Sequence, residues 1–272
     1  MLSAVLLALP LSFFGCATAP TVKRTLAEET QTVINADRLN QRELAVLQRI
    51  VAKLMPLVNE RRSQGTQVTI TFDEIYRPLD SEETNFLKTL QSIKPETLGV
   101  KTPYRGFGSS STRLTRLDQS YTDTKGVKVD IPPQYLPEKV NRNYETMMAA
   151  MQQEIGTRLY VVSGYRSGAY QLYLFLINLP NHDWSVRETS RFVAFPGYSE
   201  HGDASRQALD FTNHDNISDQ LEKFAESPEY RWLIERGACF GFALSYPLNS
   251  PTGITFEPWH WHAEDSLQCN NK

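Results

Sequence analysis

The sequence predicts an α+β protein in which helices flank a small, largely antiparallel sheet and a mainly helical region precedes it. Helical and strand-like hydrophobic spacings follow one another along the chain, without the regular strand-helix-strand repeat of a parallel α/β fold. The composition is that of an ordinary globular protein, since 40% of the 272 residues are hydrophobic and 22% are charged, which argues against disorder.

The chain carries little net charge. Its formal net charge is -3 and its pI is near 6.0, so it offers no basic field that would hold a phosphate backbone. We therefore expect no nucleic-acid partner.

The N-terminus has the features of an export signal. The apolar run from Leu2 to Phe14 is too short to cross a bilayer as a helix. Gly15 and Cys16 follow directly and resemble the cleavage box of a lipoprotein. We expect residues 1–15 to be a signal peptide and Cys16 to carry a lipid that anchors the chain to the membrane. An ordinary signal peptide cleaved near residues 17–19 is the alternative. Both predict an exported, periplasmic or cell-envelope protein.

Two cysteines remain once Cys16 is assigned to a lipid. Cys239 and Cys269 form an even pair in a compartment where disulfides persist. A bond between them requires that their backbones approach closely, which the sequence does not determine.

Residues 16–42 are polar and are expected to form a tether that runs into a first helix. A mainly helical region follows over residues 43–105. Apolar residues recur at helical spacing from Leu44 to Val58, and Pro56 is expected to kink or shorten this helix near its end.

Two further elements are predicted in the helical region. Asp80 and Glu83 have the spacing of a capping box that opens a helix through about residue 93. Val68, Ile70 and Phe72 alternate with polar residues, which predicts a half-buried strand.

A linker is predicted over residues 106–128, because it opens with a run of Gly and Ser, and a second domain is predicted over 129–272. Within this domain we expect helices at 140–155, 169–177 and 230–236, with a methionine cluster as core filler in the first. Short strands are expected at 159–162, 207–212 and 242–246.

The histidines are concentrated in this second domain, and none occurs before His182. A catalytic zinc ion takes three protein ligands from His and Asp or Glu and keeps one position for water. His201 and His260 lie beside carboxylates. A strand at 207–212 would place Leu209 in the core and Asp210 on the opposite face, where it can serve as a ligand. A surface Asp at a turn is the alternative.

The segment from Glu257 to His262 also combines these residue types. Pro258 argues against a helix, so an extended segment is expected. A regular strand would place His260 and His262 on one face and Glu257 on the other, so Glu257 joins the site only through a bend or bulge. A plain aromatic core edge, built on the two tryptophans of this segment, is the alternative.

Four motifs in this order resemble the D-alanyl-D-alanine carboxypeptidases of the vancomycin-resistance (VanY-like) type. The resemblance covers about residues 130–264. The motifs are Ser163-Gly164-Tyr165-Arg166-Ser167 with Tyr170-Gln171, Pro196-Gly197-Tyr198-Ser199-Glu200-His201, Ala208-Leu209-Asp210 and Glu257-Pro258-Trp259-His260.

The resemblance implies a zinc peptidase of the D-Ala-D-Ala carboxypeptidase/hedgehog-like fold that acts on peptidoglycan stem peptides. It implies that the zinc ligands are His201, Asp210 and His260. Glu257 would be the catalytic base, and Arg166 would steady the substrate carbonyl. The remaining residues expected at the substrate are Ser199, near the terminal carboxylate, Tyr165 and Gln171.

One loop departs from the family pattern. Eight residues separate His201 from Asp210, where the family usually has six, and the customary Gly is displaced to Gly202. Asp203 is therefore a rival ligand. Hydrogen bonds around the site are expected from His262, and His214 is expected at the surface.

Three functions remain open. The first is a carboxypeptidase that removes terminal D-alanine, and the second is an endopeptidase or L,D-carboxypeptidase on the same polymer. The third is a non-catalytic cell-wall-binding lipoprotein, against which Glu257 counts, because binding alone needs no base. The residues before about 130 could be a spacer, a partner-binding module or a lid.

Overall fold

Helices form the N-terminal region, as the hydrophobic spacing predicts. The computed structural model describes residues 33–107, 113–215 and 220–265, so the predicted signal peptide, Cys16 and most of the predicted tether lie outside the described residues. The helices of this region are α1 (Gln41–Ser63), α2 (Phe72–Tyr76) and α3 (Ser81–Ser92). A capping box between Asn40 and Glu43 opens α1, and Pro56 lies inside the helix without ending it.

Capping side chains determine where α2 and α3 begin. The predicted capping box of Asp80 and Glu83 is confirmed at the start of α3. The predicted strand at residues 68–72 is wrong, because residues 67–69 form a 3₁₀ turn and Thr71 caps α2 through reciprocal hydrogen bonds with Glu74. Val68 and Ile70 are buried at this irregular segment, so their alternation reflects packing rather than a strand.

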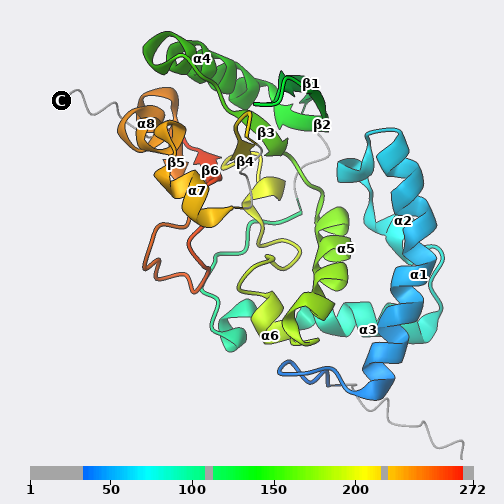
Figure 1. Cartoon of the computed structure of the whole chain (residues 1–272). Coiled ribbons are helices and arrows are strands. Elements are labelled where there is room, and N and C mark those ends of the chain that lie inside the picture. The colour runs from blue at the N-terminus through cyan, green and yellow to red at the C-terminus, as the bar shows by residue number, and fades with distance from the viewer. Residues whose placement is uncertain (1–32, 108–112, 216–219, 266–272) are drawn as a thin grey trace, which may run out of the picture. The chain divides into compact units, whose positions relative to one another are not determined.

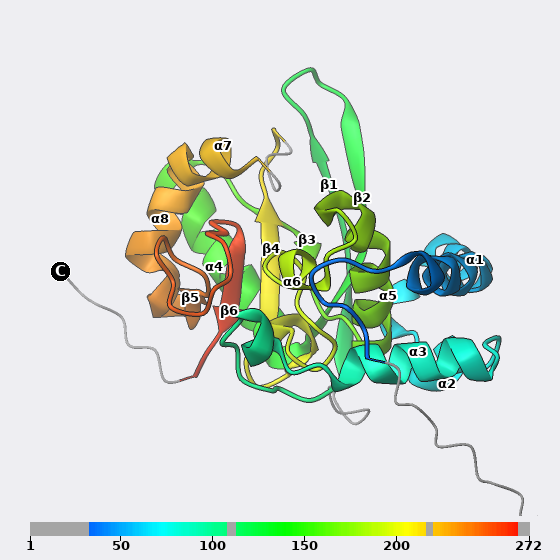
Figure 2. The ribbon, with the colours of Figure 1, turned by 90° about the horizontal axis from the view of Figure 1, so that it is seen from below.

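Part of the predicted linker is instead a β-hairpin. β1 (Leu114–Thr122) pairs antiparallel with β2 (Lys128–Pro137), and Figure 2 shows the hairpin extending away from the neighbouring helices. Within β1, Leu117 and Tyr121 are buried while the other side chains are exposed or half-buried, so the sequence carries little hydrophobic alternation. A two-stranded sheet has unpaired edges, which accommodates the prolines of β2.

The second sheet is antiparallel, in the order β3-β4-β6-β5. Its strands are β3 (Tyr160–Ser163), β4 (Ala208–Thr212), β5 (Phe242–Leu244) and β6 (His260–Ala263). Its core combines residues of β4 and β6 with residues of α4 (Glu138–Ile155) and α8 (Pro228–Arg236), which lie beside the sheet in Figure 1. The predicted α+β class is therefore confirmed.

The three helices predicted for the second domain are present as α4, α5 (Gly168–Asn178) and α8. The methionines of α4 are buried in the core, as expected. Short helices α6 (Val186–Thr189) and α7 (Leu221–Glu226) complete the fold. Cys239 is disulfide-bonded, and the other two cysteines of the sequence lie outside the described residues.

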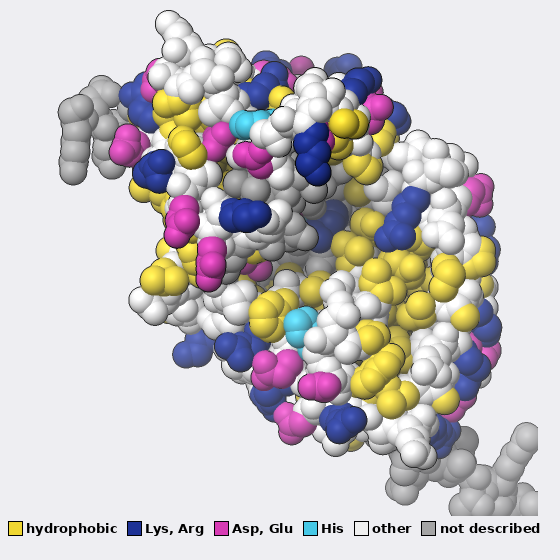
Figure 3. Space-filling model, viewed as in Figure 1, with side chains coloured by type: hydrophobic (Ala, Val, Ile, Leu, Met, Phe, Trp, Pro, Cys, Tyr) yellow, Lys and Arg dark blue, Asp and Glu magenta, His cyan; other side chains and the backbone are white. Residues whose placement is uncertain are grey.

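The N-terminal helices and the second domain share a hydrophobic core. Side chains of α1, α3 and α5 are buried together, and all the described residues belong to one compact unit. On the face shown in Figure 3, hydrophobic side chains gather over α5 and its neighbours, and Lys and Arg are interspersed with Asp and Glu. No helix in the described part of the chain has the length and apolarity that a membrane crossing requires.

Candidate metal centre

Asp210 and His260 face each other on neighbouring strands. They are register partners in β4 and β6, and Asp210 Oδ1 lies 2.9 Å from His260 Nδ1. Leu209 and Phe211 are fully buried in the core beneath the sheet, so Asp210 projects from the opposite face. The alternation in the sequence therefore places this carboxylate on a rigid strand.

His201 approaches the same carboxylate from a loop. It lies in the 3₁₀ turn Glu200–Gly202, where the Ser199 hydroxyl accepts a hydrogen bond from its N–H. The ring is fully buried, and its Nδ1 lies 2.7 Å from the Gly164 carbonyl oxygen, to which it donates. Nε2 is thereby turned toward Asp210 Oδ2, 3.2 Å away.

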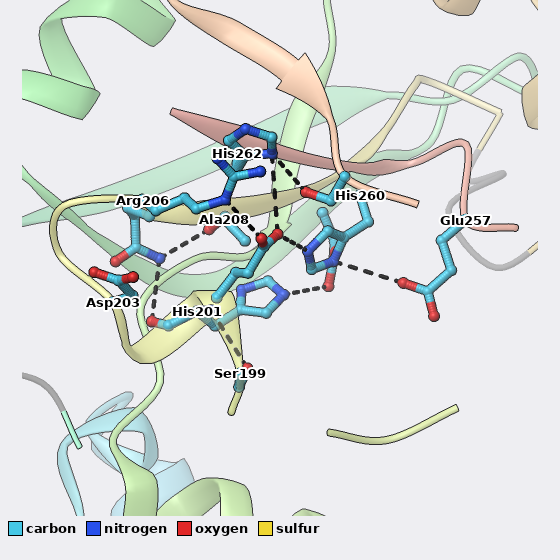
Figure 4. Close-up of polar contacts among 12 residues, drawn as sticks. Ser199, His201, Asp203, Arg206, Ala208, Glu257, His260 and His262 are labelled. Atoms are coloured by element: carbon cyan, nitrogen blue, oxygen red, sulfur yellow. Dashed lines mark hydrogen bonds and ion pairs between the residues drawn. The ribbon is translucent and has the colours of Figure 1, made fainter. Parts of the chain in front are cut away.

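These three residues meet the requirements of a metal site (Figure 4). One ligand atom of each lies within 4.8 Å of the others, and no second cluster of three or more His, Cys, Asp or Glu residues with this geometry occurs among the described residues. His201 Nε2 is buried without a hydrogen bond, as expected of an atom that binds a cation. Two histidines and a carboxylate are a ligand set of catalytic zinc sites.

His201, Asp210 and His260 shift one another's pKa values. Burial lowers the pKa of His201 to about 4, so this ring is neutral. Burial opposes ionisation of Asp210, but the nearby histidines outweigh it and hold the pKa of Asp210 well below its usual value. Burial also acts against protonation of His260, yet Asp210 and Glu200 raise its pKa to about 10. His260 must lose this proton before Nδ1 can act as a ligand.

Glu200 holds the far side of His260 and was not predicted. Its Oε2 lies 3.2 Å from His260 Nε2, and the side chain is buried. Burial acts to raise the pKa of Glu200, but the hydrogen bond and charge of His260 outweigh it and keep the carboxylate ionised. Ligand histidines commonly donate their second nitrogen to a carboxylate, so a search for such a partner among the acids near the ligands could have found Glu200.

Glu257 reaches the site through the bend that its sequence position requires. His260 N donates to the Glu257 carbonyl oxygen in a turn, and Glu257 Oε2 then lies 3.6 Å from His260 Nδ1. Figure 4 shows the side chain pointing toward the ligands from the segment just before β6. Burial is the main cause that raises the pKa of Glu257 to about 7, and Asp210 adds to it.

A pocket of about 300 Å³ opens beside these residues, and Arg166, Gln171 and Ser199 line it. The Nε atom of Arg166 is buried and has no hydrogen-bond partner. Burial lowers the pKa of Arg166, while Asp210 and Glu257 act in the opposite direction. Gln171 donates from Nε2 to the Ala194 carbonyl and leaves its buried Oε1 without a partner. The pocket therefore offers unpaired donors and acceptors to a ligand.

Several other predicted residues lie outside the pocket lining. Tyr165 is not part of the lining, and its N–H donates to the Tyr135 carbonyl oxygen. The rival ligand Asp203 pairs with Arg105 at 3.2 Å and does not belong to the metal cluster. His262 is buried near Glu200, with Nδ1 2.7 Å from Ser245 Oγ.

His214 is partly exposed, as predicted, and lies 3.7 Å from Asp215. Trp261 is buried in the core, whereas Trp259 packs against the core and also lines the pocket. The turn after Glu257 interrupts the strand and explains this difference, because β6 begins only at His260.

The fold and the site define a metallopeptidase-type centre on an antiparallel sheet. Residues 133–263 match the family model described as VanY, D-alanyl-D-alanine carboxypeptidase. This segment contains the three metal-cluster residues, Glu257 and Arg166. Over this segment the chain matches the VanY family, as the sequence motifs predict.

Individual relatives match about half of the chain. The putative carboxypeptidase YodJ of Bacillus subtilis (strain 168) is 31% identical over 135 residues, which are 48% of this chain and 46% of that protein. The bifunctional D-Ala-D-Ala dipeptidase and D-Ala-D-Ala carboxypeptidase VanXYC of Enterococcus gallinarum is 32% identical over 131 residues, 47% of this chain and 66% of that protein. The chain thus spans less than half the length of the first of these relatives.

A solved structure of the LdcB LD-carboxypeptidase aligns over 62% of this chain and 77% of that chain. The TM-score is 0.47 and the sequence identity is 26%.

Proposed function

We propose that this protein is a zinc peptidase of the bacterial cell wall that removes the terminal D-alanine from stem peptides ending in D-Ala-D-Ala. The observation that carries the proposal is the position of Glu257, a carboxylate that is 16% exposed, lies 3.6 Å from His260 and is outside the His-Asp-His cluster. A binding protein would need no such group. The VanY family match and the relatives named above as carboxypeptidases support the substrate class.

The residues of the site divide the chemistry among them. His201, Asp210 and His260 would hold the zinc ion, which would supply a more acidic water and a positive charge. Glu257 is placed to take a proton from the attacking water and to pass it to the leaving amine. Arg166 is placed to donate hydrogen bonds to the carbonyl oxygen as negative charge develops on it.

The role of Glu257 predicts an acid limb in the pH dependence of kcat/KM. The pKa of Glu257 is raised to about 7, and a bound cation favours the carboxylate form. Because a base must be deprotonated, activity should fall as pH decreases through the pKa, with a midpoint at about 7 or below. Initial rates measured across pH test this expectation. A constant kcat/KM between about pH 5 and 8 would contradict it.

The choice of bond depends on recognition of a free carboxylate. Ser199 lines the pocket two residues before His201, so its hydroxyl can donate to a carboxylate there while accepting from the His201 N–H. Arg166 supplies a positive charge in the same pocket. A substrate analogue that lacks the free carboxylate would leave these donors without a partner, which makes its binding unfavourable.

We therefore expect a stem peptide ending in D-Ala-D-Ala to lose one alanine, and its C-terminal amide to be cleaved about 10²-fold more slowly. Mass spectra of the two peptides before and after incubation measure this ratio. Ser199→Ala should reduce the ratio by about tenfold. Equal cleavage of acid and amide, or opening of internal cross-links alone, would favour an endopeptidase. Release of D-alanine only from peptides with a single terminal D-alanine would favour an L,D-carboxypeptidase.

We also propose that the protein is exported and held at the cell envelope by a lipid on Cys16, after removal of residues 1–15. The apolar run before Cys16 supports this localisation, as does the disulfide-bonded state of Cys239, because disulfides persist outside the cytosol. Mass analysis of the mature N-terminus from membranes would test it, and an unmodified Cys16 would contradict it.

A further inference from the structure

Glu200 contacts His260 on the side away from Asp210. One of the residues that bind Glu200 lies outside the segment that matches the family model. Glu200 uses its two oxygens differently, with Oε2 toward His260 Nε2 at 3.2 Å and Oε1 toward two arginines. Arg105 Nη2 and Arg206 Nε each lie 2.9 Å from Oε1. Arg105 precedes residue 133, where the family match begins, whereas Arg206 lies in the longer loop between His201 and Asp210.

Arg105 is the more enclosed of the two arginines. Its side chain is 14% exposed, against 31% for Arg206. Its second terminal nitrogen, Nη1, lies 3.2 Å from Asp203 Oδ2. One guanidinium therefore joins Glu200 to the loop that departs from the family pattern. A planar guanidinium bound to two carboxylates fixes their relative orientation more strictly than an ammonium group does.

The backbone around Arg105 is docked on the loops of the site. Arg105 N donates to the Gly197 carbonyl oxygen at 2.7 Å, and Lys101 N donates to the Thr252 carbonyl oxygen at 2.6 Å. Val100 is buried together with Tyr246 and Ile254, and both of these residues line the pocket. The segment before the hairpin is thus attached to the loop of His201 and to the loop that precedes Glu257.

We infer that Arg105 is a positioning residue of the metal centre, which acts through Glu200 to fix the ring of His260 with Nδ1 toward the metal position. The region before the family segment is then a structural part of the site rather than a spacer. Loss of Arg105 removes one of the two arginine contacts to Glu200 Oε1 and leaves the contact with the partly exposed Arg206. The carboxylate is then less firmly held against His260. The inference rests on the proposed zinc site and is independent of the bond that is cut.

Zinc affinity, measured by competition with a chromophoric chelator, is the test. Arg105→Met should weaken zinc binding by about tenfold, the lower end of the effect of changing a group that supports a metal ligand. Arg105→Lys should recover part of this loss because it restores the charge. Arg187→Met is the matched control, since Arg187 also holds this segment, through the Thr97 carbonyl oxygen at 3.1 Å, but its ion pair is with Asp37 rather than with Glu200. Its zinc affinity should match that of wild type.

A double variant separates positioning from general destabilisation. If Arg105 acts through Glu200, adding Arg105→Met to Glu200→Gln should weaken zinc binding little further. The cobalt-substituted protein should show a changed visible spectrum for Arg105→Met and an unchanged one for Arg187→Met. Unaltered zinc affinity in Arg105→Met, an equal loss in Arg187→Met, or fully additive losses in the double variant would each overturn the inference. A wild-type protein that binds no zinc would overturn the proposed function as well.

Discussion

Glu257→Gln is expected to retain zinc and to lower kcat by about 10² to 10⁴-fold, the usual contribution of a general base. Glutamine has nearly the same size, so it fits the position of Glu257, but its amide cannot accept the proton of the attacking water. Glu257 lies outside the cluster of His201, Asp210 and His260, so metal content should stay near that of wild type. Elemental analysis and initial rates measured on the same preparation test both parts.

Another glutamate provides the matched control for this variant. Glu229 is 3% exposed and accepts a hydrogen bond from Thr157, and it is not among the pocket-lining residues. Glu229→Gln should leave kcat within a few-fold of wild type. If Glu257→Gln retains comparable activity, the base must be another group.

The positions of the metal-centre residues could be predicted where the residues next to them in the sequence determine which way the side chain points. Leu209 and Phe211 are apolar and bury one face of β4, so the position of Asp210 follows from strand geometry alone. Pro258 excludes a helix, and the bend that Glu257 needs is the turn found before β6. These inferences depend on neighbours within a few residues, which a single sequence contains.

The misassigned segments and Glu200 depend on information that is not local. The alternation at residues 68–72 fits a strand, but no partner strand is present beside this segment in the described structure, and the capping of α2 by Thr71 takes precedence. β1 is recognisable mainly through its pairing with β2, because few of its side chains are buried. Glu200 and Arg105 meet across 95 positions of sequence, and spacing cannot predict such a contact.

The two candidate acids of the long loop should differ sharply in their effect on zinc. Wild-type protein purified without added metal is expected to contain about one zinc per chain, held by the three-ligand set typical of catalytic sites. Asp210 touches both ligand histidines, at 3.2 Å from His201 Nε2 and 2.9 Å from His260 Nδ1. Asp210→Ala removes a ligand and the negative charge between the two rings, so zinc binding and activity should both be lost.

Asp203→Ala is the matched control, because it removes the same type of side chain from the loop that precedes β4. Asp203 pairs with Arg105 and accepts hydrogen bonds from Ser205, so it supports the loop without contacting the ligands. Its loss should weaken zinc binding by no more than about tenfold, as for other groups that support a metal site from outside. Zinc content after dialysis against a chelator compares the two variants directly. If Asp203→Ala loses zinc while Asp210→Ala keeps it, Asp203 is the ligand and the assignment of residues 202–209 to a connecting loop is wrong.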